Sequence, residues 1–500
     1  MTIKRNVFAS WLSHGLTLVI GLFLVRYVKE TLGDTGYGAW IFVSSIAGYS
    51  GLLYMGFGAA VCRYSARYYT LQDWPGLNRI LSSIFAIYVV NSLIAIFGAA
   101  ICALFADRIS DWEGQSLTEV RQVLLMLGLN AAIGLWGSVY SGLLVGLQRF
   151  DIQRGLIILC TLVRTAIVVI GLNWHPSLVV MAGSFLAVTL LENLTYFLAA
   201  RRLVPQLHVA WRFVSREAFK ECYGFTAFNA LGMLSDYLIS LTDTVVIGVM
   251  LGTAATVPYY IAQRLCQMAR APLEQLAEVM MPRAGELQIR QELHRLRSMV
   301  LQGTGLSLLL IGGFAIGCAF FADQLLMIWL GAGNEASPPI LMVLLAAQVI
   351  ALPLRVPKMT LMGMGDIRTP ALFDVVQATA NLVLSLIFVQ NFGVIGVAYG
   401  TLLPAICCEL GLLLPYTCRR LGLPVRDLVV ESVLPQIPSF AALWVYCELV
   451  SRLPVAASWL SLIGIAAGGG AVLLAIRGGI YWLAKRQAAA IAPPQEMVTT

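Results

Sequence analysis

Fourteen apolar stretches, most of them close to membrane-spanning length, run through this chain of 500 residues. A bilayer core is about 30 Å thick, and an α-helix needs about 20 apolar residues to cross it. The sequence therefore predicts an all-α integral membrane protein with about fourteen transmembrane helices. The expected spans are Ala9–Tyr27, Tyr37–Ala60, Ile80–Phe105, Val123–Gly146, Ile157–Leu172, Leu178–Ala200, Phe225–Leu251, Val257–Met281, Met299–Phe321, Pro338–Met362, Leu372–Phe388, Val394–Thr417, Val429–Val450 and Trp459–Trp482.

The composition excludes several classes of soluble protein. Hydrophobic residues make up 59% of the chain and charged residues 12%, whereas soluble domains carry about 25% charged residues. This rules out a soluble enzyme and a disordered chain. The net charge of +7 does not indicate nucleic acid as a partner, because the basic residues are spread in small groups and form no single patch. The ten cysteines lie mostly in apolar runs and are expected to be buried thiols.

The distribution of Lys and Arg predicts the orientation in the membrane. With the N-terminus inside, 22 of the 33 basic residues lie in inside segments, five in outside segments and six within spans. Short cytoplasmic loops carry such an excess of positive charge. We therefore expect both termini in the cytoplasm.

An internal repeat at a spacing near 217 residues predicts two lobes. Glu192 aligns with Glu409, and each is followed by a double arginine, at 201–202 and at 419–420. An even number of spans in each copy gives parallel repeats, the plan of some alternating-access transporters. The predicted domains are an N-terminal six-helix lobe (1–205), a C-terminal six-helix lobe (206–424), two additional helices (425–487) and a disordered tail (488–500). Chance similarity between apolar helices is the alternative.

Polar residues inside the spans are the candidate functional groups, because ionisable side chains are costly in lipid and usually face the bundle interior. Four of them lie at i, i+4, i+7 and i+11 on one helical face, between residues 263 and 274. The predicted substrate-cavity residues are Gln263, Arg264, Gln267, Arg270, Arg164, Asp236 and Asp243. The predicted ion-coupling residues are Asp236, Asp243 and Glu274.

The same residues allow a second interpretation, in which they form ion pairs that lock helices together. Arg164 would then pair with Glu192, and Arg270 with Asp236 or Asp243. In the first interpretation, the planar guanidinium groups of the arginines would instead hold phosphate or carboxylate oxygens of a substrate.

Motifs of several enzyme classes are missing from the sequence. It contains no P-loop lysine, no G-x-S-x-G and no H-E-x-x-H. We therefore expect no enzymatic activity, no cofactor and no resident metal. Transport would draw on an ion gradient of H⁺ or Na⁺, on the membrane potential or on the gradient of the substrate itself.

Short motifs in the first 270 residues resemble those of a known family. They are Leu32-Gly33, Tyr37–Trp40, Ser45–Tyr49, Gly56–Gly58 running to Arg63-Tyr64, Gly146–Asp151, Asp243–Gly248, Leu251-Gly252 and Tyr259–Ala262. They resemble the polysaccharide transporter family, within the superfamily that also contains multidrug extruders and the peptidoglycan-precursor flippase.

The resemblance implies a flippase of the bacterial inner membrane. Its substrate would be an undecaprenyl-diphosphate-linked oligosaccharide used for O-antigen, capsule or exopolysaccharide, and its partners would be membrane lipids and a polysaccharide polymerase. The diphosphate would suit Arg264 and Arg270. Two alternatives stay open at this point: an ion-coupled multidrug antiporter of related fold, and a membrane polysaccharide polymerase or lipid-sugar transferase.

Overall fold

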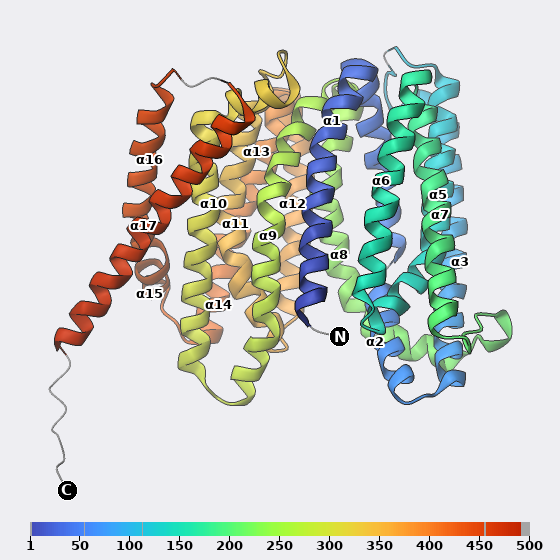
Figure 1. Ribbon diagram of the computed structural model, residues 1–500, viewed down its shortest axis with the longest axis horizontal. Coiled ribbons are helices and arrows are strands. Elements are labelled where there is room, and N and C mark those ends of the chain that lie inside the picture. The colour runs from blue at the N-terminus through green and yellow to red at the C-terminus, as the bar shows by residue number, and fades with distance from the viewer. Residues whose placement is uncertain (1–2, 55, 113, 455–456, 492–500) are drawn as a thin grey trace, which may run out of the picture. The chain divides into compact units, whose positions relative to one another are not determined.

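The computed structural model describes the backbone of residues 3–54, 56–112, 114–454 and 457–491, with side chains for these residues except 3–14, 223–233, 236 and 480–491. Every element in this part of the chain is helical (Figure 1). The elements are α1 (Ile3–Gly48), η1 (Tyr49–Tyr54), α2 (Phe57–Thr70), α3 (Trp74–Leu104), α4 (Ala106–Ile109), α5 (Leu117–Gly146), α6 (Phe150–Trp174), α7 (Leu178–Leu203), η2 (Trp211–Phe213), α8 (Arg216–Met250), α9 (Thr256–Ile289), α10 (Leu293–Leu330), α11 (Ser337–Gly363), α12 (Arg368–Phe392), α13 (Val394–Ala405), η3 (Ile406–Leu413), α14 (Leu414–Leu421), α15 (Val425–Leu428), η4 (Val429–Val433), η5 (Leu434–Gln436), α16 (Ile437–Ser451) and α17 (Trp459–Ile491).

Ten helices in the described residues are long and apolar enough to cross a membrane. They include α3, α5, α6, α7, α10, α11 and α12, and the runs 394–421, 425–451 and 459–479. The prediction of an all-α membrane protein is confirmed. Three further long helices, α1, α8 and α9, are not among the ten, so the count of fourteen spans stays a prediction.

Several helix starts follow from polar caps in the sequence. Ser116, Ser177 and Ser215 each accept a hydrogen bond from a backbone amide in the first turn of α5, α7 and α8. A capped amide needs no other partner, and such caps are typically worth about 1 kcal/mol. These serines define where the long apolar helices begin.

The first two expected spans agree with the structure in part. The stretch α1, from Ile3 to Gly48, consists of two helices that meet at a kink at Gly33, whose φ of 69° is left-handed. The expected span Tyr37–Ala60 is not one helix, because the chain changes to η1 after Gly48 and restarts as α2 after Gly56, with φ of 70°. Glycine adopts this conformation without the steric cost of a Cβ atom.

The described chain divides into two compact units. Unit 1 comprises residues 1–261 and 374–400, and unit 2 comprises residues 262–373 and 401–500. These boundaries differ from the predicted lobe boundaries at 205 and 424, which follow the sequence repeat rather than contacts. The repeat-based lobes stay a prediction. Of the predicted tail, residues 488–491 continue α17 and residues 492–500 lie outside the described part.

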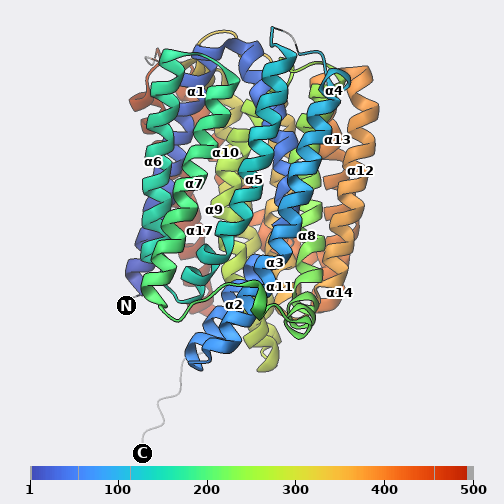
Figure 2. The same cartoon turned by 90° about the vertical axis from the view of Figure 1, so that its right-hand side faces the viewer.

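Within unit 1, α5 is the central helix. It packs against α3, α7 and α2, while α6 packs against α7 and α1, and Figure 2 shows α3, α5, α6 and α7 side by side. A buried apolar cluster fills the space between α2, α3 and α5, with Phe57, Ile80 and Leu135 among its members. The packed helices hold the α5 and α7 side chains that face each other in fixed positions.

Within unit 2, α10 packs against α11 and α16, and α17 runs obliquely past α16 and α10 (Figure 1). A buried cluster that includes Leu287, Leu296 and Leu421 joins the ends of α9 and α10 to α14. This packing holds α9 and α11, which carry the arginines described below.

Candidate functional site

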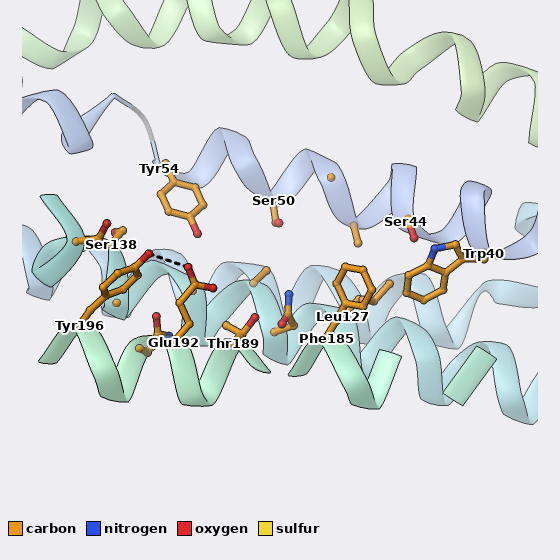
Figure 3. Close-up of a pocket in the computed structure, with 18 residues that line it drawn as sticks. Trp40, Ser44, Ser50, Tyr54, Leu127, Ser138, Phe185, Thr189, Glu192 and Tyr196 are labelled. Carbon is orange, nitrogen blue, oxygen red and sulfur yellow. Dashed lines mark hydrogen bonds between the residues drawn. The ribbon is translucent and has the colours of Figure 1, made fainter. Parts of the chain in front are cut away.

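A cavity of about 470 Å³ lies inside unit 1, between α1, η1, α5 and α7. Figure 3 shows Trp40, Phe185 and Leu127 near one end, and Tyr54, Glu192 and Tyr196 near the other. Sites that bind small molecules are typically about 300–1,000 Å³. The lining residues are Trp40, Ser44, Ala47, Gly48, Ser50, Tyr54, Leu127, Asn130, Ala131, Gly134, Gly137, Ser138, Ser141, Phe185, Thr189, Glu192, Asn193 and Tyr196.

Helical periodicity explains why α5 and α7 line the cavity together. Each helix contributes residues at i, i+4, i+7, i+8 and i+11, starting at Asn130 on α5 and at Phe185 on α7. Residues at this spacing share one face of an α-helix. The α5 face is built of small and polar side chains, and this leaves room between the two helices.

Gly137 on α5 makes space for Asn193 on α7. A Cβ atom at position 137 would lie 1.6 Å from Oδ1 of Asn193, which no side chain tolerates. The Nδ2 of Asn193 donates to the carbonyl of Ile133 on α5. A glycine is therefore required for α7 to approach α5 in this way.

An ion pair adjoins the cavity at Glu192. Arg164 on α6 lies 3.6 Å from Oε2 of Glu192, and the Tyr196 hydroxyl donates to Oε1 at 2.8 Å. The guanidinium of Arg164 also lies 5.0 Å from the ring centroid of Phe185, within the range of a cation–π contact. Of the two predicted roles of Arg164, the pairing with Glu192 is observed. Arg164 itself is not among the lining residues.

Three buried polar atoms at this site make no hydrogen bond among the described residues. They are Oγ of Ser44, Oδ1 of Asn130 and Nε of Arg164. A buried polar atom without a partner typically costs about 1–3 kcal/mol. Ser44 and Asn130 line the cavity, so a bound molecule could satisfy their oxygen atoms.

A second ionic cluster lies in unit 2, between α9 and α11. Arg270 lies 2.8 Å from Oε1 of Glu274, one turn later on α9, and Arg355 on α11 lies 3.9 Å from the same oxygen. All three side chains are less than one third exposed. Among the described side chains, these contacts bring two guanidinium groups to one carboxylate. Pro272 lies between Arg270 and Glu274 on α9, and because it has no N–H it cannot donate to the carbonyl of Met268, one turn earlier.

The remaining polar residues predicted on α9 have different surroundings. Gln263 and Arg264 are half-buried and Gln267 is exposed. The Nε atoms of Arg264 and Arg355 are buried and make no hydrogen bond with any described residue. Unit 2 therefore has guanidinium N–H groups available for an anionic acceptor.

Of the two aspartates predicted on α8, Asp243 has a described side chain, and it lies in a third group of polar side chains. Asp243 is 1% exposed. Its carboxylate accepts hydrogen bonds from Tyr259 at the start of α9, at 2.5 Å, and from Ser385 on α12, at 3.2 Å. It joins three helices inside unit 1 and does not line the cavity described above. The side chain of Asp236 lies outside the described residues.

The structure thus divides the predicted site residues into separate groups: Arg164 beside the unit 1 cavity, Arg270 with Glu274 in unit 2, and Asp243 in a buried hydrogen-bond group. The sequence analysis missed the uncharged lining residues, such as Ser44, Asn130 and Thr189. The helical spacing of the lining residues on α5 and α7 is the signal that could have found Asn130 and Thr189. In the described part of the chain, no group of three or more His, Cys, Asp or Glu side chains is arranged to hold a metal ion.

Comparison with known protein families identifies the chain. The family model described as "Polysaccharide biosynthesis protein" matches residues 3–288, more than half of the sequence. The chain belongs to this family. The resemblance inferred from the motifs is confirmed, and the family region covers the whole unit 1 cavity and the α9 segment that carries Arg264, Arg270 and Glu274.

Two relatives match this polysaccharide biosynthesis protein, one along most of its length and the other along slightly less than half. The "Uncharacterized membrane protein EpsK" of Bacillus subtilis is 19% identical over 471 residues, which cover 93% of this chain and 92% of that protein. The "Probable low-salt glycan biosynthesis flippase Agl15" of Haloferax volcanii is 21% identical over 235 residues, covering 45% of this chain and 49% of that protein.

Solved structures show that this family member has a transporter fold. The "Lipid II flippase MurJ, inward closed conformation" matches with a TM-score of 0.72 at 13% identity, covering 96% of this chain and 99% of that one. A "multidrug resistance MATE family transporter of the MOP superfamily" matches with a TM-score of 0.64 at 16% identity, covering 80% and 94%. The relatives whose names state a role are flippases and transporters, so the prediction that the chain is not an enzyme is confirmed.

Proposed function

We propose that this protein is a flippase that moves an undecaprenyl-diphosphate-linked oligosaccharide across the bacterial inner membrane by alternating access. The family match over residues 3–288 carries the proposal. A name such as that of Agl15, a probable glycan biosynthesis flippase, supports this kind of cargo. The cargo combines sugar, diphosphate and lipid, so its transporter needs polar and cationic groups inside an apolar bundle, and both are present.

The diphosphate would bind at the cationic cluster of unit 2. Arg270 and Arg355 both contact the carboxylate of Glu274, so guanidinium groups from two helices come together at one place. The Nε of Arg355 and that of Arg264 lack acceptors among the described residues. Guanidinium groups bind phosphate oxygens through strong charge-assisted hydrogen bonds.

The orientation and the driving force are further parts of the proposal. The excess of Lys and Arg in the predicted inside segments supports cytoplasmic termini. Coupling to H⁺ or Na⁺ would use the acids predicted for it, Asp236, Asp243 or Glu274. A polysaccharide polymerase on the far side of the membrane would take up the flipped unit.

A reconstitution experiment tests the function. Purified protein is placed in vesicles that carry a fluorescent undecaprenyl-diphosphate-linked sugar in both leaflets, and accessibility of the label to a membrane-impermeant quencher is followed. We expect faster exchange between leaflets than in empty vesicles. Exchange should fall at least about tenfold in Arg270→Ala, as expected from the loss of a charge-assisted contact.

Arg452→Ala is the matched control, because Arg452 is an exposed arginine that pairs with Glu448 and belongs to neither cluster. It should exchange label like the wild type. Exchange no faster than in empty vesicles, or an equal loss in both variants, would defeat the proposal.

A multidrug antiporter is the second candidate, and the fold match to a MATE family transporter favours it. The same vesicles, loaded with a cationic dye, distinguish the two. Dye efflux that depends on an H⁺ or Na⁺ gradient, with no exchange of the labelled lipid, would support the antiporter.

A further inference from the structure

We propose that the cavity of unit 1 is a binding subsite for an uncharged sugar ring of the cargo. The inference rests on the proposed function, because it assumes an oligosaccharide as cargo. It adds where that oligosaccharide is recognised and which kind of sugar residue is accepted. Three observations carry it: the hydrogen-bonding groups of the cavity, its aromatic walls and its charge balance.

The cavity offers hydrogen-bonding groups suited to hydroxyl groups. Oγ of Ser44 on α1 and Oδ1 of Asn130 on α5 are buried and make no hydrogen bond in the described protein. Ser50 and Thr189 add hydroxyl groups near the middle of the cavity (Figure 3). A sugar hydroxyl donates one hydrogen bond and accepts others, so it can supply the missing hydrogen-bond partners of serine, threonine and amide groups at the same time.

Aromatic rings supply the apolar surface that a sugar also needs. Trp40 and Phe185 line one end, with ring centroids 5.3 Å apart, and Tyr54 lies toward the other end (Figure 3). Pyranose rings carry C–H groups on their faces, and a flat aromatic ring packs against such a face while the ring's hydroxyl edge stays free for hydrogen bonds. The lining therefore combines flat apolar walls with polar groups between them.

The charges at the cavity favour a neutral ligand. The carboxylate of Glu192 is balanced by Arg164 at 3.6 Å and accepts a hydrogen bond from Tyr196. The pair has no net charge, so a carboxylate or phosphate on the ligand would meet Glu192 with no surplus cation. Oε1 and Oε2 of Glu192 can instead accept hydrogen bonds from hydroxyl groups of a ligand. Such hydrogen bonds are strong because the acceptor is charged.

The geometry of the lining also limits what the site accepts. The cavity volume of about 470 Å³ is at the lower end of the range for small-molecule sites, so it fits a short piece of a glycan rather than a whole repeat unit. The polyprenyl chain, which has no hydrogen-bonding groups, would leave the buried oxygens of Ser44 and Asn130 unsatisfied. The site is thus specific for the sugar end of the cargo.

Direct binding of lipid-free sugars tests the inference. The full-length protein in nanodiscs is mixed with the methyl glycosides of glucose, galactose and N-acetylglucosamine, and with methyl glucuronide as a charged probe. Contact is detected by saturation-transfer NMR. We expect transfer to at least one neutral glycoside and weaker transfer to the glucuronide. In Ser44→Ala and Asn130→Ala, the Kd should rise up to about tenfold, as for one lost hydrogen bond.

Asn391→Ala is the matched control, because Asn391 is an exposed asparagine at the end of α12, and it should bind glycosides like the wild type. Ser44→Ala removes one oxygen atom only, so it keeps the test valid if Asn130→Ala fails to fold. The inference is overturned if no neutral glycoside shows transfer, if the pocket variants bind like the wild type, or if methyl glucuronide binds as well as the neutral probes.

The binding experiment and the vesicle experiment distinguish a failure of the sugar subsite from a failure of the flippase function. Loss of glycoside binding with intact exchange of the labelled lipid would overturn the subsite and leave the flippase function standing. Glycoside binding that responds to Ser44→Ala, without any exchange of the labelled lipid, would keep a sugar site and overturn the function.

Discussion

The two units use the same residue types in ionic clusters of different charge. In unit 1, one arginine faces one glutamate, Arg164 to Glu192. In unit 2, two arginines face one glutamate, Arg270 and Arg355 to Glu274. The first cluster pairs its charges one to one and adjoins a cavity with aromatic walls, whereas the second brings two guanidinium groups to one carboxylate. In the proposals above, the first arrangement serves a sugar and the second a phosphate.

The units also differ in how the cluster is made. The pair in unit 1 joins two helices, α6 and α7, and Tyr196 holds the carboxylate in place. The cluster in unit 2 has one contact within α9 and one longer contact to α11. A carboxylate fixed by several partners is a poor acceptor for a new cation, whereas an arginine with spare N–H groups is a good donor to a new anion.

Charge reversal in unit 2 should have the largest effect. Arg355→Glu would leave two carboxylates and one arginine in the cluster, so an anionic diphosphate would be repelled. Like charges in a binding site typically cost several kcal/mol, which corresponds to a loss of about a hundredfold or more in exchange of the labelled lipid. Arg355→Lys keeps the charge and should retain a measurable rate. Wild-type exchange in Arg355→Glu would contradict a role of Arg355 in binding the diphosphate.

The second-largest effect should come from adding a methyl group to the wall of the unit 1 cavity. In Gly137→Ala, the new Cβ would meet Oδ1 of Asn193 at 1.6 Å, so the Asn193 side chain or the helix that carries it must shift. Overpacking of this kind typically costs about 1–3 kcal/mol, measured by equilibrium unfolding in mixed micelles. Gly317→Ala on α10 of unit 2 is the control, since nothing lies within 4 Å of its added Cβ. It should be neutral or stabilise by up to about 1 kcal/mol.

Removing one hydroxyl group should show how firmly Glu192 is held. Tyr196→Phe deletes a hydrogen bond to a carboxylate, and we expect a loss of about 1–2 kcal/mol in unfolding free energy. Tyr446→Phe in unit 2 deletes a bond to a neutral carbonyl, that of Ile465, at 3.2 Å. It should cost less, about 0.5–1 kcal/mol. Equal losses in the two variants would indicate that the charge of Glu192 adds nothing.

The smallest effect concerns the loop between α11 and α12. Burial raises the pKa of Asp366, but hydrogen bonds from Tyr416 and Thr369 and the charge of Arg420 outweigh it, so the pKa of this carboxyl lies below its ordinary 3.8. A depressed pKa contributes stability above the unfolded-state value, and that stability is lost as the pH falls through the folded-state value.

The melting temperature of the detergent-solubilised protein checks this sign. Asp366→Asn should melt slightly below the wild type at pH 6, and the difference should shrink as the pH falls below about 3.8. Tyr416→Phe should raise the pKa of Asp366. The acid transition of this variant should therefore lie at a higher pH than that of the wild type. A difference in melting temperature that grows as the pH falls would contradict the lowered pKa of Asp366.

The helices could be predicted from the sequence because their apolar length is a strong signal. The expected span Leu178–Ala200 lies within α7, which starts at the same residue. The interruption after Gly48 could not be predicted this way, because residues 49–56 contain no charged side chain that would mark the end of a span. The chain changes there to η1, and α2 begins after Gly56 with its left-handed φ of 70°; hydropathy does not measure either backbone conformation.

The site was predicted in part, and the difference has a physical reason. Arg164, Arg270 and Glu274 stand out because charges are rare in apolar spans. From the sequence, Arg164 could either line a substrate cavity or pair with Glu192. The pairing follows from the packing of α6 on α7, which the sequence does not give. Ser44, Asn130 and Thr189 were missed because a single uncharged polar side chain is common in membrane helices. Their role depends on three helices presenting them to one cavity.

Pro272 gives the unit 2 cluster a mechanical property. Proline has no amide hydrogen, so the turn of α9 from Met268 to Pro272 has one backbone hydrogen bond fewer than its neighbours. Proline is a common place for a helix to bend. Because Arg270 and Glu274 lie on either side of Pro272, any bend there would change the distance between their side chains and, with it, the longer contact from Arg355 to Glu274.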